Sequence, residues 1–310
     1  MKDEIKIFFK GDVDDSEETL LKYSRDASLL EVRPKLVLFP KDKEDVKKIV
    51  KWVHDNKDKY ADSERNKDYA NLSITARCAG TDMSGGAIGE SLILDFSRYM
   101  NKLIAFPPSP LQGEGRGEVN YSITVQPGMF YRDFEKITLD KGLILPCYTA
   151  SKSLNALGGM YGNNSAGERT LKYGKVEDYV ISAKVVFADG NEYVVKSLNQ
   201  NELNKKIAQN DLEGKSTSYG AGFEGEIYRR IYNLIKDNEE EIKLAKPKVH
   251  KNSAGYYIWN VMSDSSPDKG RSGGVVFDLN KLLVGAQGTL GITTEITFKL
   301  VKENKYSKLV

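Results

Sequence analysis

The sequence contains few of the residues that build metal centres and disulfide-bonded frameworks. It has two cysteines, Cys78 and Cys147, and two histidines, His54 and His250, in 310 residues. The two cysteines lie far apart and lack metal-binding spacing, which argues against a disulfide framework or a zinc site. Two histidines are too few for a multi-histidine metal centre. We therefore expect no metal site.

Long apolar runs and a strong charge of one sign are also absent. No apolar run approaches the ~20 residues needed to cross a bilayer, and residues 1–4 lack the apolar core of a secretory signal. The formal charge is +2, from 46 basic and 44 acidic residues, which gives no electrostatic basis for binding nucleic acid. We expect a cytoplasmic protein without a transmembrane segment or a nucleic-acid partner. A peripheral position at the inner face of the membrane stays open.

The chain is long enough for two lobes, since a typical domain has ~150 residues. A hydrophobic content of 40% excludes a disordered chain. An apolar run ending at Phe39 predicts a strand, and helical spacing after Asp42 or Lys43 predicts a helix. A second strand, Leu72–Arg77, runs into a glycine-rich loop. This order is typical of an α/β beginning.

Later segments alternate between strand and helix signals. Asp189-Gly190 between two apolar runs predicts a hairpin, and residues 293–300 predict a strand. An apolar stripe predicts one helix from Glu224 to about Leu244. Residues 107–118 are dense in proline and glycine and predict an exposed insertion.

Three glycine-rich segments follow predicted strands, and we name them loop 1 (Arg77–Gly86), loop 2 (Gly158–Gly167) and loop 3 (Gly285–Gly291). Such loops expose backbone N–H groups and suit anions such as a pyrophosphate. Loop 1 lacks the G-x-G-x-x-G and P-loop patterns of common nucleotide sites. Small residues are too dense in loop 2 for a core helix and favour a planar ligand lying against backbone. Taken alone, loop 1 is equally consistent with a tight turn, and loop 3 indicates a turn that connects two strands.

Together the three loops resemble the FAD-binding domain of the vanillyl-alcohol oxidase and p-cresol methylhydroxylase type. Loop 1 matches R-G-G-G-T-x-x-S-G-G, residues 158–174 align with G-G-x-x-A-T-N-A-G-G-x-R-x-L-K-Y-G, and loop 3 matches G-S-E-G-T-L-G. Residues 23–28 resemble the family's Y-S-x-D-x-S segment. Within this FAD-linked oxidase family, the chain is most similar to the branch that contains glycolate oxidase, D-lactate dehydrogenase and D-2-hydroxyglutarate dehydrogenase.

The resemblance implies an α+β fold, a two-lobed PCMH-type FAD-binding domain with a small α/β lobe, a larger mixed-sheet lobe and a helical insert. Residues 1–105 would form the N-terminal lobe with the pyrophosphate loop, and 106–118 a flexible insertion. Residues 119–197 and 271–303 would form the second lobe, and 198–270 the mostly helical insert.

The resemblance also implies non-covalent FAD, because loop 1 has no histidine where some relatives tether the flavin. A cysteinyl flavin at Cys147 is the alternative, and a small packed residue is the favoured interpretation. Backbone amides of loop 1 would hold the pyrophosphate. The residues implied at the cofactor are Arg77, Ala79, Gly80, Thr81, Asp82, Met83, Ser84, Gly85, Ser151, Gly158, Gly159, Gly162, Asn163, Asn164, Ser165, Val180, Ile181, Gly288, Gly291 and Ile292.

For catalysis, the family transfers a hydride from the α-carbon of a 2-hydroxy acid to flavin N5. A segment resembling the family's K-N-x-x-G-Y run supplies the candidates His250 as base, and Lys251 or Ser253 as partners of the substrate carboxylate. The alternative is an exposed basic turn. Gln287 stands where the loop 3 motif has Glu, so we expect the charges on the substrate side to differ from those of the family.

The leading hypothesis is therefore an FAD-dependent dehydrogenase acting on a 2-hydroxy acid such as D-lactate, glycolate or D-2-hydroxyglutarate, with an unspecified electron acceptor. The resemblance stops where the family's C-terminal cap would begin, which implies either a truncated or a separately encoded FAD-binding domain. In the second case a partner chain would carry the cap or an iron–sulfur domain. Two alternatives remain: an enzyme like UDP-N-acetylenolpyruvoylglucosamine reductase, and a catalytically silent FAD-binding electron-transfer subunit.

Overall fold

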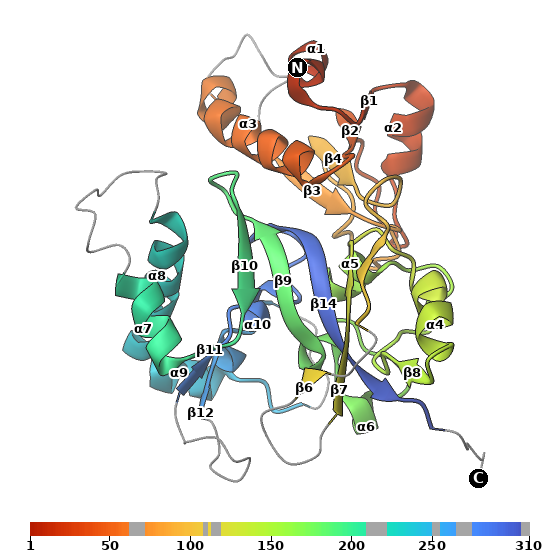
Figure 1. Ribbon diagram of the computed structural model, residues 1–310. Coiled ribbons are helices and arrows are strands. Elements are labelled where there is room, and N and C mark those ends of the chain that lie inside the picture. The colour runs from red at the N-terminus through yellow and green to blue at the C-terminus, as the bar shows by residue number, and fades with distance from the viewer. Residues whose placement is uncertain are drawn as a thin grey trace.

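The structure is a computed structural model that describes residues 1–61, 72–107, 111–112, 119–208, 222–249, 255–264 and 275–304. Helices and strands are mixed, with one four-stranded and one seven-stranded sheet and a small third sheet (Figure 1). The expected two-lobed α+β fold is confirmed. None of the described helices combines the length and apolar character needed to cross a membrane.

The first sheet has the strand order β1-β2-β4-β3. Its strands are β1 (Asp12–Asp14), β2 (Leu36–Phe39), β3 (Ile74–Arg77) and β4 (Leu92–Asp95). The last three are parallel, and β2 and β4 are buried at every residue, which is why both appear in the sequence as unbroken apolar runs. The helices of this lobe are α1 (Lys2–Phe8), α2 (Glu17–Tyr23) and α3 (Lys43–Ala61).

The second sheet is antiparallel, in the order β10-β9-β14-β7-β5. These strands are β5 (Leu103–Ala105), β7 (Val119–Val125), β9 (Val180–Val186), β10 (Glu192–Lys196) and β14 (Ile292–Lys302). The short strands β6 (Leu111–Gln112) and β8 (Leu143–Ile144) pair with β7 and β14. The buried residues of β14 pack on α4 (Tyr131–Leu139), where Phe298 meets Phe134 at 6.4 Å between ring centroids.

The pairing of β5 with β7 bears on the proposed lobe boundary at residue 105. β5 lies before that boundary in sequence, yet it forms an edge of the second sheet. We therefore propose that the first lobe ends before Leu103. Most of the expected insertion at 106–118 lies outside the described residues.

The segment after β10 contains helices and a small sheet. The helices are α7 (Gln200–Ala208), α8 (Phe223–Asp237) and α9 (Glu239–Ala245), and the strands are β11 (Leu198–Asn199), β12 (Met262–Asp264) and β13 (Val275–Phe277). The single helix predicted at 224–244 is interrupted at Asn238, whose φ of −125° and ψ of 29° are not helical and whose side chain caps the carbonyl of Leu234. The remaining elements are α5 (Leu157–Gly162), α6 (Thr170–Tyr173), η1 (Val176–Asp178), η2 (Ile258–Asn260) and α10 (Asn280–Leu283).

Candidate functional site

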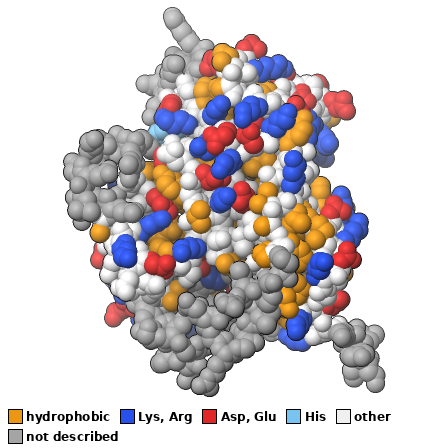
Figure 2. All heavy atoms as spheres, in the orientation of Figure 1, with side chains coloured by type: hydrophobic (Ala, Val, Ile, Leu, Met, Phe, Trp, Pro, Cys, Tyr) orange, Lys and Arg blue, Asp and Glu red, His pale blue; other side chains and the backbone are white. Residues whose placement is uncertain are grey.

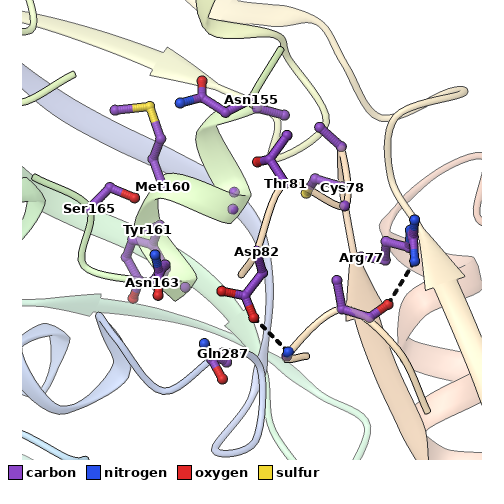
Figure 3. Close-up of a pocket in the computed structure, with 18 of the residues that line it drawn as sticks. Arg77, Cys78, Thr81, Asp82, Asn155, Met160, Tyr161, Asn163, Ser165 and Gln287 are labelled. Atoms are coloured by element: carbon purple, nitrogen blue, oxygen red, sulfur yellow. Dashed lines mark hydrogen bonds between the residues drawn. The ribbon is translucent and has the colours of Figure 1, made fainter. Parts of the chain in front are cut away.

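The three glycine-rich loops, far apart in sequence, meet around one cavity of about 890 Å³. Figure 3 shows Asp82 of loop 1, Asn163 of loop 2 and Gln287 of loop 3 around this space. Loop 3 is tied to α5 by two backbone hydrogen bonds, from Gly285 N to Tyr161 O at 3.0 Å and from Gln287 N to Gly162 O at 2.9 Å. A cavity of this volume is at the upper end of the range for small-molecule sites.

Loop 1 follows β3 at the carboxyl edge of the parallel strands, a usual place for ligands in α/β sheets. Gly80 has φ +67°, and a Cβ there would lie 2.3 Å from Arg77 Nη2. The backbone N–H groups of residues 79–84 donate to no acceptor in the described part of the chain. Successive unpaired N–H groups bordering a cavity are suited to bind an anion such as a diphosphate.

Arg77 holds loop 1 against the segment that precedes β2. Its guanidinium donates to Ala87 O at 3.0 Å and to Arg25 O at 2.8 Å, and it lies 5.0 Å from the centroid of the Tyr23 ring. Ala27 N donates to Gly80 O at 3.1 Å. Residues 23–28 therefore belong to the site as its outer support, which explains why they resemble a family motif.

The Tyr23 hydroxyl donates to Asp95 Oδ2 at 3.0 Å, beneath the same loop. Burial raises the pKa of the Asp95 carboxyl above its usual value, and hydrogen bonds from Ser97 oppose that rise. The exposed fraction of Asp95 is 2%. This carboxyl supports loop 1 from below and does not line the cavity.

Asp82 closes loop 1 from within. Its Oδ2 accepts hydrogen bonds from Gly86 N at 2.5 Å and from Ser84 Oγ at 2.9 Å. A Cβ on Gly86 would lie 2.6 Å from Gln287 Oε1 and 2.8 Å from Asp82 Oδ2, so a side chain here would displace both. Arg77 and Asp82 are the charged side chains among the described residues that line the cavity.

Loop 2 departs from expectation, because its first part is the helix α5. Leu157, Met160 and Tyr161 are buried at helical spacing and pack into the core of the second lobe. The glycines occupy the opposite face. A Cβ on Gly159 would meet no atom within 4 Å, so α5 presents bare backbone to the cavity. Bare backbone beside unpaired N–H groups fits a flat ring system joined to a diphosphate, as in FAD.

Most of the residues that the sequence implied at the cofactor line this cavity. They are Arg77, Ala79, Gly80, Thr81, Asp82, Met83, Ser84, Ser151, Gly158, Gly159, Gly162, Asn163, Ser165, Gly288 and Gly291. Ile292 lines a neighbouring hollow of about 280 Å³ that shares Gly288 and Gly291 with the main cavity. His54 of α3 lines the same hollow.

Four implied cofactor residues line neither space. Asn164 is fully buried and accepts a hydrogen bond from Glu177 N at 3.1 Å. Val180 and Ile181 begin β9, where Val180 pairs with Phe298 of β14, and Gly85 contacts Leu30 on the outer side of loop 1. The catalytic candidates His250, Lys251 and Ser253 lie outside the described residues.

The cavity wall also contains side chains that sequence reasoning did not assign to the site. Cys78 lies at the position of a glycine in the loop 1 motif, and its Sγ donates to Pro127 O at 3.4 Å. Burial raises the pKa of this thiol. Tyr161 and Asn155 line the wall because of how α5 packs, for which the sequence carries no local signal. Cys147 is buried in the core of the second lobe and does not line the cavity.

Comparison with known proteins places this site in a family. The FAD binding domain family matches residues 34–196. The chain is 26% identical to the D-2-hydroxyglutarate dehydrogenase of Escherichia coli (strain K12) over 302 residues, which cover 97% of this chain and 26% of that protein. It is 26% identical to the glycolate oxidase subunit GlcD of Bacillus subtilis (strain 168) over 298 residues, covering 95% and 43%. The chain thus spans about a quarter of the length of the dehydrogenase.

Solved structures agree on the fold. An alkyldihydroxyacetonephosphate synthase matches with a TM-score of 0.57 at 18% identity, over 97% of this chain and 40% of that one. The 6-hydroxy-D-nicotine oxidase from Arthrobacter nicotinovorans matches with a TM-score of 0.53 at 16% identity, over 95% and 43%. The matched region contains loop 1 and loop 2, and the cavity that they line has a volume of about 890 Å³ and free N–H donors that suit a flavin dinucleotide. The chain belongs to the FAD binding domain family, and its cofactor is FAD.

Proposed function

We propose that the protein is an FAD-dependent dehydrogenase that oxidises a 2-hydroxy acid such as D-2-hydroxyglutarate, D-lactate or glycolate. The observation that carries this proposal is the convergence of loops 1, 2 and 3 on one cavity, with all three motifs resembling those of the hydroxy-acid branch of the family. The relatives named above, a D-2-hydroxyglutarate dehydrogenase and a component of glycolate oxidase, support the same substrate class.

The described residues have distinct tasks in this proposal. Bound FAD supplies a two-electron acceptor that takes the substrate hydride at N5. The N–H groups of residues 79–84 bind the diphosphate, and Gly159 lets the ring system approach the backbone of α5. Arg77 keeps loop 1 in place through its bonds to the carbonyls of Ala87 and Arg25.

The catalytic roles rest on the motif around residue 250. We propose His250 as base and Lys251 or Ser253 as the group that holds the substrate carboxylate. The described chain resumes just after them, where the Tyr256 hydroxyl lies 2.8 Å from Thr289 Oγ1 of loop 3. This contact ties the sequence that follows the candidates to the cofactor loops and supports their assignment.

The test uses the purified chain loaded with FAD. We expect tight FAD binding, and anaerobic bleaching of the flavin absorbance by at least one of D-2-hydroxyglutarate, D-lactate and glycolate. The L-enantiomers of the two chiral acids should not bleach it. Bleaching by NADPH with no response to any hydroxy acid would contradict the proposal and favour the reductase alternative.

A second candidate is an FAD-binding electron-transfer subunit without its own substrate. It is favoured by one observation: among the described residues that line the cavity, Arg77 is the one basic side chain, and its guanidinium donates to the carbonyls of Ala87 and Arg25. FAD binding without bleaching by any hydroxy acid, followed by reduction by a chemical donor such as dithionite, would support this candidate over the dehydrogenase.

A further inference from the structure

We propose that Asp82 and Gln287 form a matched pair that fastens loop 1 to loop 3, and that a second negative charge at this junction weakens binding of the diphosphate of FAD. The proposal rests on the FAD site described above. It concerns which side chains tune that site, a question that the loop motifs do not answer.

Hydrogen bonds join loop 1 and loop 3 at this junction. Asp82 Oδ2 accepts from Gly86 N at 2.5 Å and from Ser84 Oγ at 2.9 Å, and Gln287 Nε2 donates to the same Ser84 Oγ at 3.5 Å. The backbone N of Gln287 donates to Gly162 O at 2.9 Å. One glutamine thus contacts loop 1 through its side chain and loop 2 through its backbone.

The junction contains one acidic side chain, that of Asp82. No ion pair to Asp82 is found within the described ranges, so its carboxylate charge is not neutralised by a neighbouring side chain. The other charged group of the cavity wall, Arg77, points its guanidinium at the carbonyls of Ala87 and Arg25. Loop 1, whose N–H groups are suited to a diphosphate, therefore contains one acidic residue, Asp82. This acid is tolerated because its hydrogen bonds to Ser84 and Gly86 order the loop.

Residue 287, on the loop 3 side of the junction, has a neutral side chain. The loop 3 motif has Glu where this chain has Gln287. The Oε1 of Gln287 and the Oδ2 of Asp82 both lie beside the α-carbon of Gly86. A Cβ on Gly86 would be less than 3 Å from each of these oxygens. A glutamate at 287 would bring a second carboxylate beside the first, and like charges at ~4 Å repel by about 1–4 kcal/mol between water and a protein surface. The neutral amide avoids that repulsion.

The backbone of Gln287 supports the same conclusion. Its φ is +52°, in the left-handed region that disfavours side chains, although loop 3 uses glycine at its other positive-φ positions, Gly285 and Gly288. Backbone strain of ~1–3 kcal/mol at a site is retained where the side chain is used. The strained position carries an amide that reaches loop 1.

The experiment compares wild type, Asp82→Asn, Gln287→Glu and the double variant D82N/Q287E. Dissociation constants for FAD and for riboflavin, which lacks phosphate, are measured by flavin fluorescence at low and high salt. We expect Q287E to weaken FAD binding by about tenfold, with a smaller defect at high salt because the repulsion is screened. The double variant should return to within about threefold of wild type, since it carries one carboxylate again. Riboflavin binding should be equal in all four proteins.

Two charge changes away from the cavity serve as controls, Asp140→Asn after α4 and Gln200→Glu on α7, and both should bind FAD as wild type does. Equal FAD affinity of Q287E and wild type would overturn the proposal. So would a double variant no better than Q287E, or a parallel loss of riboflavin affinity.

If Q287E does not fold, as judged by its thermal unfolding, the decision passes to Asp82. Asp82→Ala removes the acceptor for Gly86 N and should weaken FAD binding by about tenfold, whereas D82N keeps an acceptor and should stay within about threefold. Equal binding by both would overturn the proposal. A wild-type chain that binds riboflavin and FAD, but is reduced by no hydroxy acid, would contradict the proposed function and leave this inference standing.

Discussion

At the scale of single residues, two glycines close together in loop 2 are glycine for opposite reasons. A Cβ on Gly159 would meet nothing within 4 Å, while a Cβ on Gly167 would lie 2.0 Å from the carbonyl oxygen of Tyr148. The first glycine keeps space free for a ligand, and the second permits close packing of backbone on backbone. The same residue type therefore has a functional role at one position and a structural role at the other.

We predict that Gly159→Ala and Gly167→Ala have opposite effects. Gly159→Ala should raise the free energy of unfolding by up to about 1 kcal/mol, because alanine is the better helix former, and should weaken FAD binding. Gly167→Ala should lower the free energy of unfolding by more than about 1 kcal/mol, because the backbone must move. Urea denaturation of the FAD-free protein and FAD titration measure the two quantities. A Gly159→Ala protein with unchanged FAD affinity would show that α5 does not face the cofactor.

The sequence predicted which segments form the site and most of the residues that line the cavity, but it missed some side chains of the cavity wall. Loop 1 could be recognised because glycines, Thr81 and Ser84 recur at fixed spacing. Cys78 and Tyr161 could not, because their places depend on contacts between segments far apart in sequence, such as that of Cys78 Sγ with Pro127 O. For Val180 and Ile181, which the resemblance placed at the cofactor, the local sequence does not show which way they face. The structure places them at the start of β9, apart from both cavities.

At the scale of elements, η1 is where several parts of the second lobe are joined. Glu177 is buried there, 2.9 Å from Lys175 Nζ, and accepts from Asn260 Nδ2 of η2 at 3.1 Å. Lys281 of α10 donates to its backbone carbonyl at 2.5 Å. Burial alone would raise the pKa of Glu177, but Lys175 outweighs it and holds this pKa below the usual value of 4.5.

We predict that Glu177→Gln lowers the free energy of unfolding by about 2 kcal/mol at pH 7, because Lys175 loses its buried partner. Because the folded-state pKa of Glu177 is lowered, its contribution is present above about pH 4.5 and is lost as the pH falls through the folded-state pKa. The two proteins should therefore converge in acid. Urea denaturation at several pH values provides the measurement.

The matched control is Glu239→Gln on α9. Glu239 pairs with Lys243 at 2.8 Å, and both side chains are exposed. Its loss should leave the free energy of unfolding almost unchanged, because an exposed ion pair is screened by water. A similar cost for both variants would mean that the Glu177 pair stabilises no more than a surface pair does.

The elements differ in how well the sequence predicted them. β2 and β4 were plain from their apolar runs, and the β9–β10 hairpin from Asp189-Gly190. The break between α8 and α9 was missed, since an apolar stripe continues past Asn238 and one asparagine gives a weak signal. The pairing of β5 with β7 was not predicted, because the partner of a strand depends on residues far away in the sequence and not on residues 103–105 alone.

At the scale of the whole molecule, the cofactor site is built from both lobes. Loop 1 extends from the first sheet, while α5 and loop 3 belong to the second lobe. The visible face carries acidic and basic side chains interspersed, without a large area of one sign (Figure 2). The order of the three motifs along the chain was enough to predict this architecture, whereas the substrate was not encoded in any of them.

Because residues of both lobes line the cavity, we predict that FAD stabilises the whole chain. At a free concentration of a hundred times its dissociation constant, it should add about 2.7 kcal/mol to the free energy of unfolding and raise the thermal midpoint by several degrees. ADP and riboflavin, each half of the ligand, should each give a smaller shift. Differential scanning calorimetry provides the measurement. A shift confined to one of two separate transitions would indicate that FAD binds a single lobe.

Strand β14 has a consequence for how the protein is made. It lies between β7 and β9 in the sheet, yet it follows both in the chain, and loop 3 directly precedes it. During translation, β7 and β9 leave the ribosome before β14, the strand that pairs with both of them. The edges of β7 and β9 that face β14 therefore stay unpaired until β14 has been synthesised. The cavity lacks its third wall for the same period. The cavity that would hold the flavin is therefore complete only once loop 3 has been synthesised and has met loops 1 and 2.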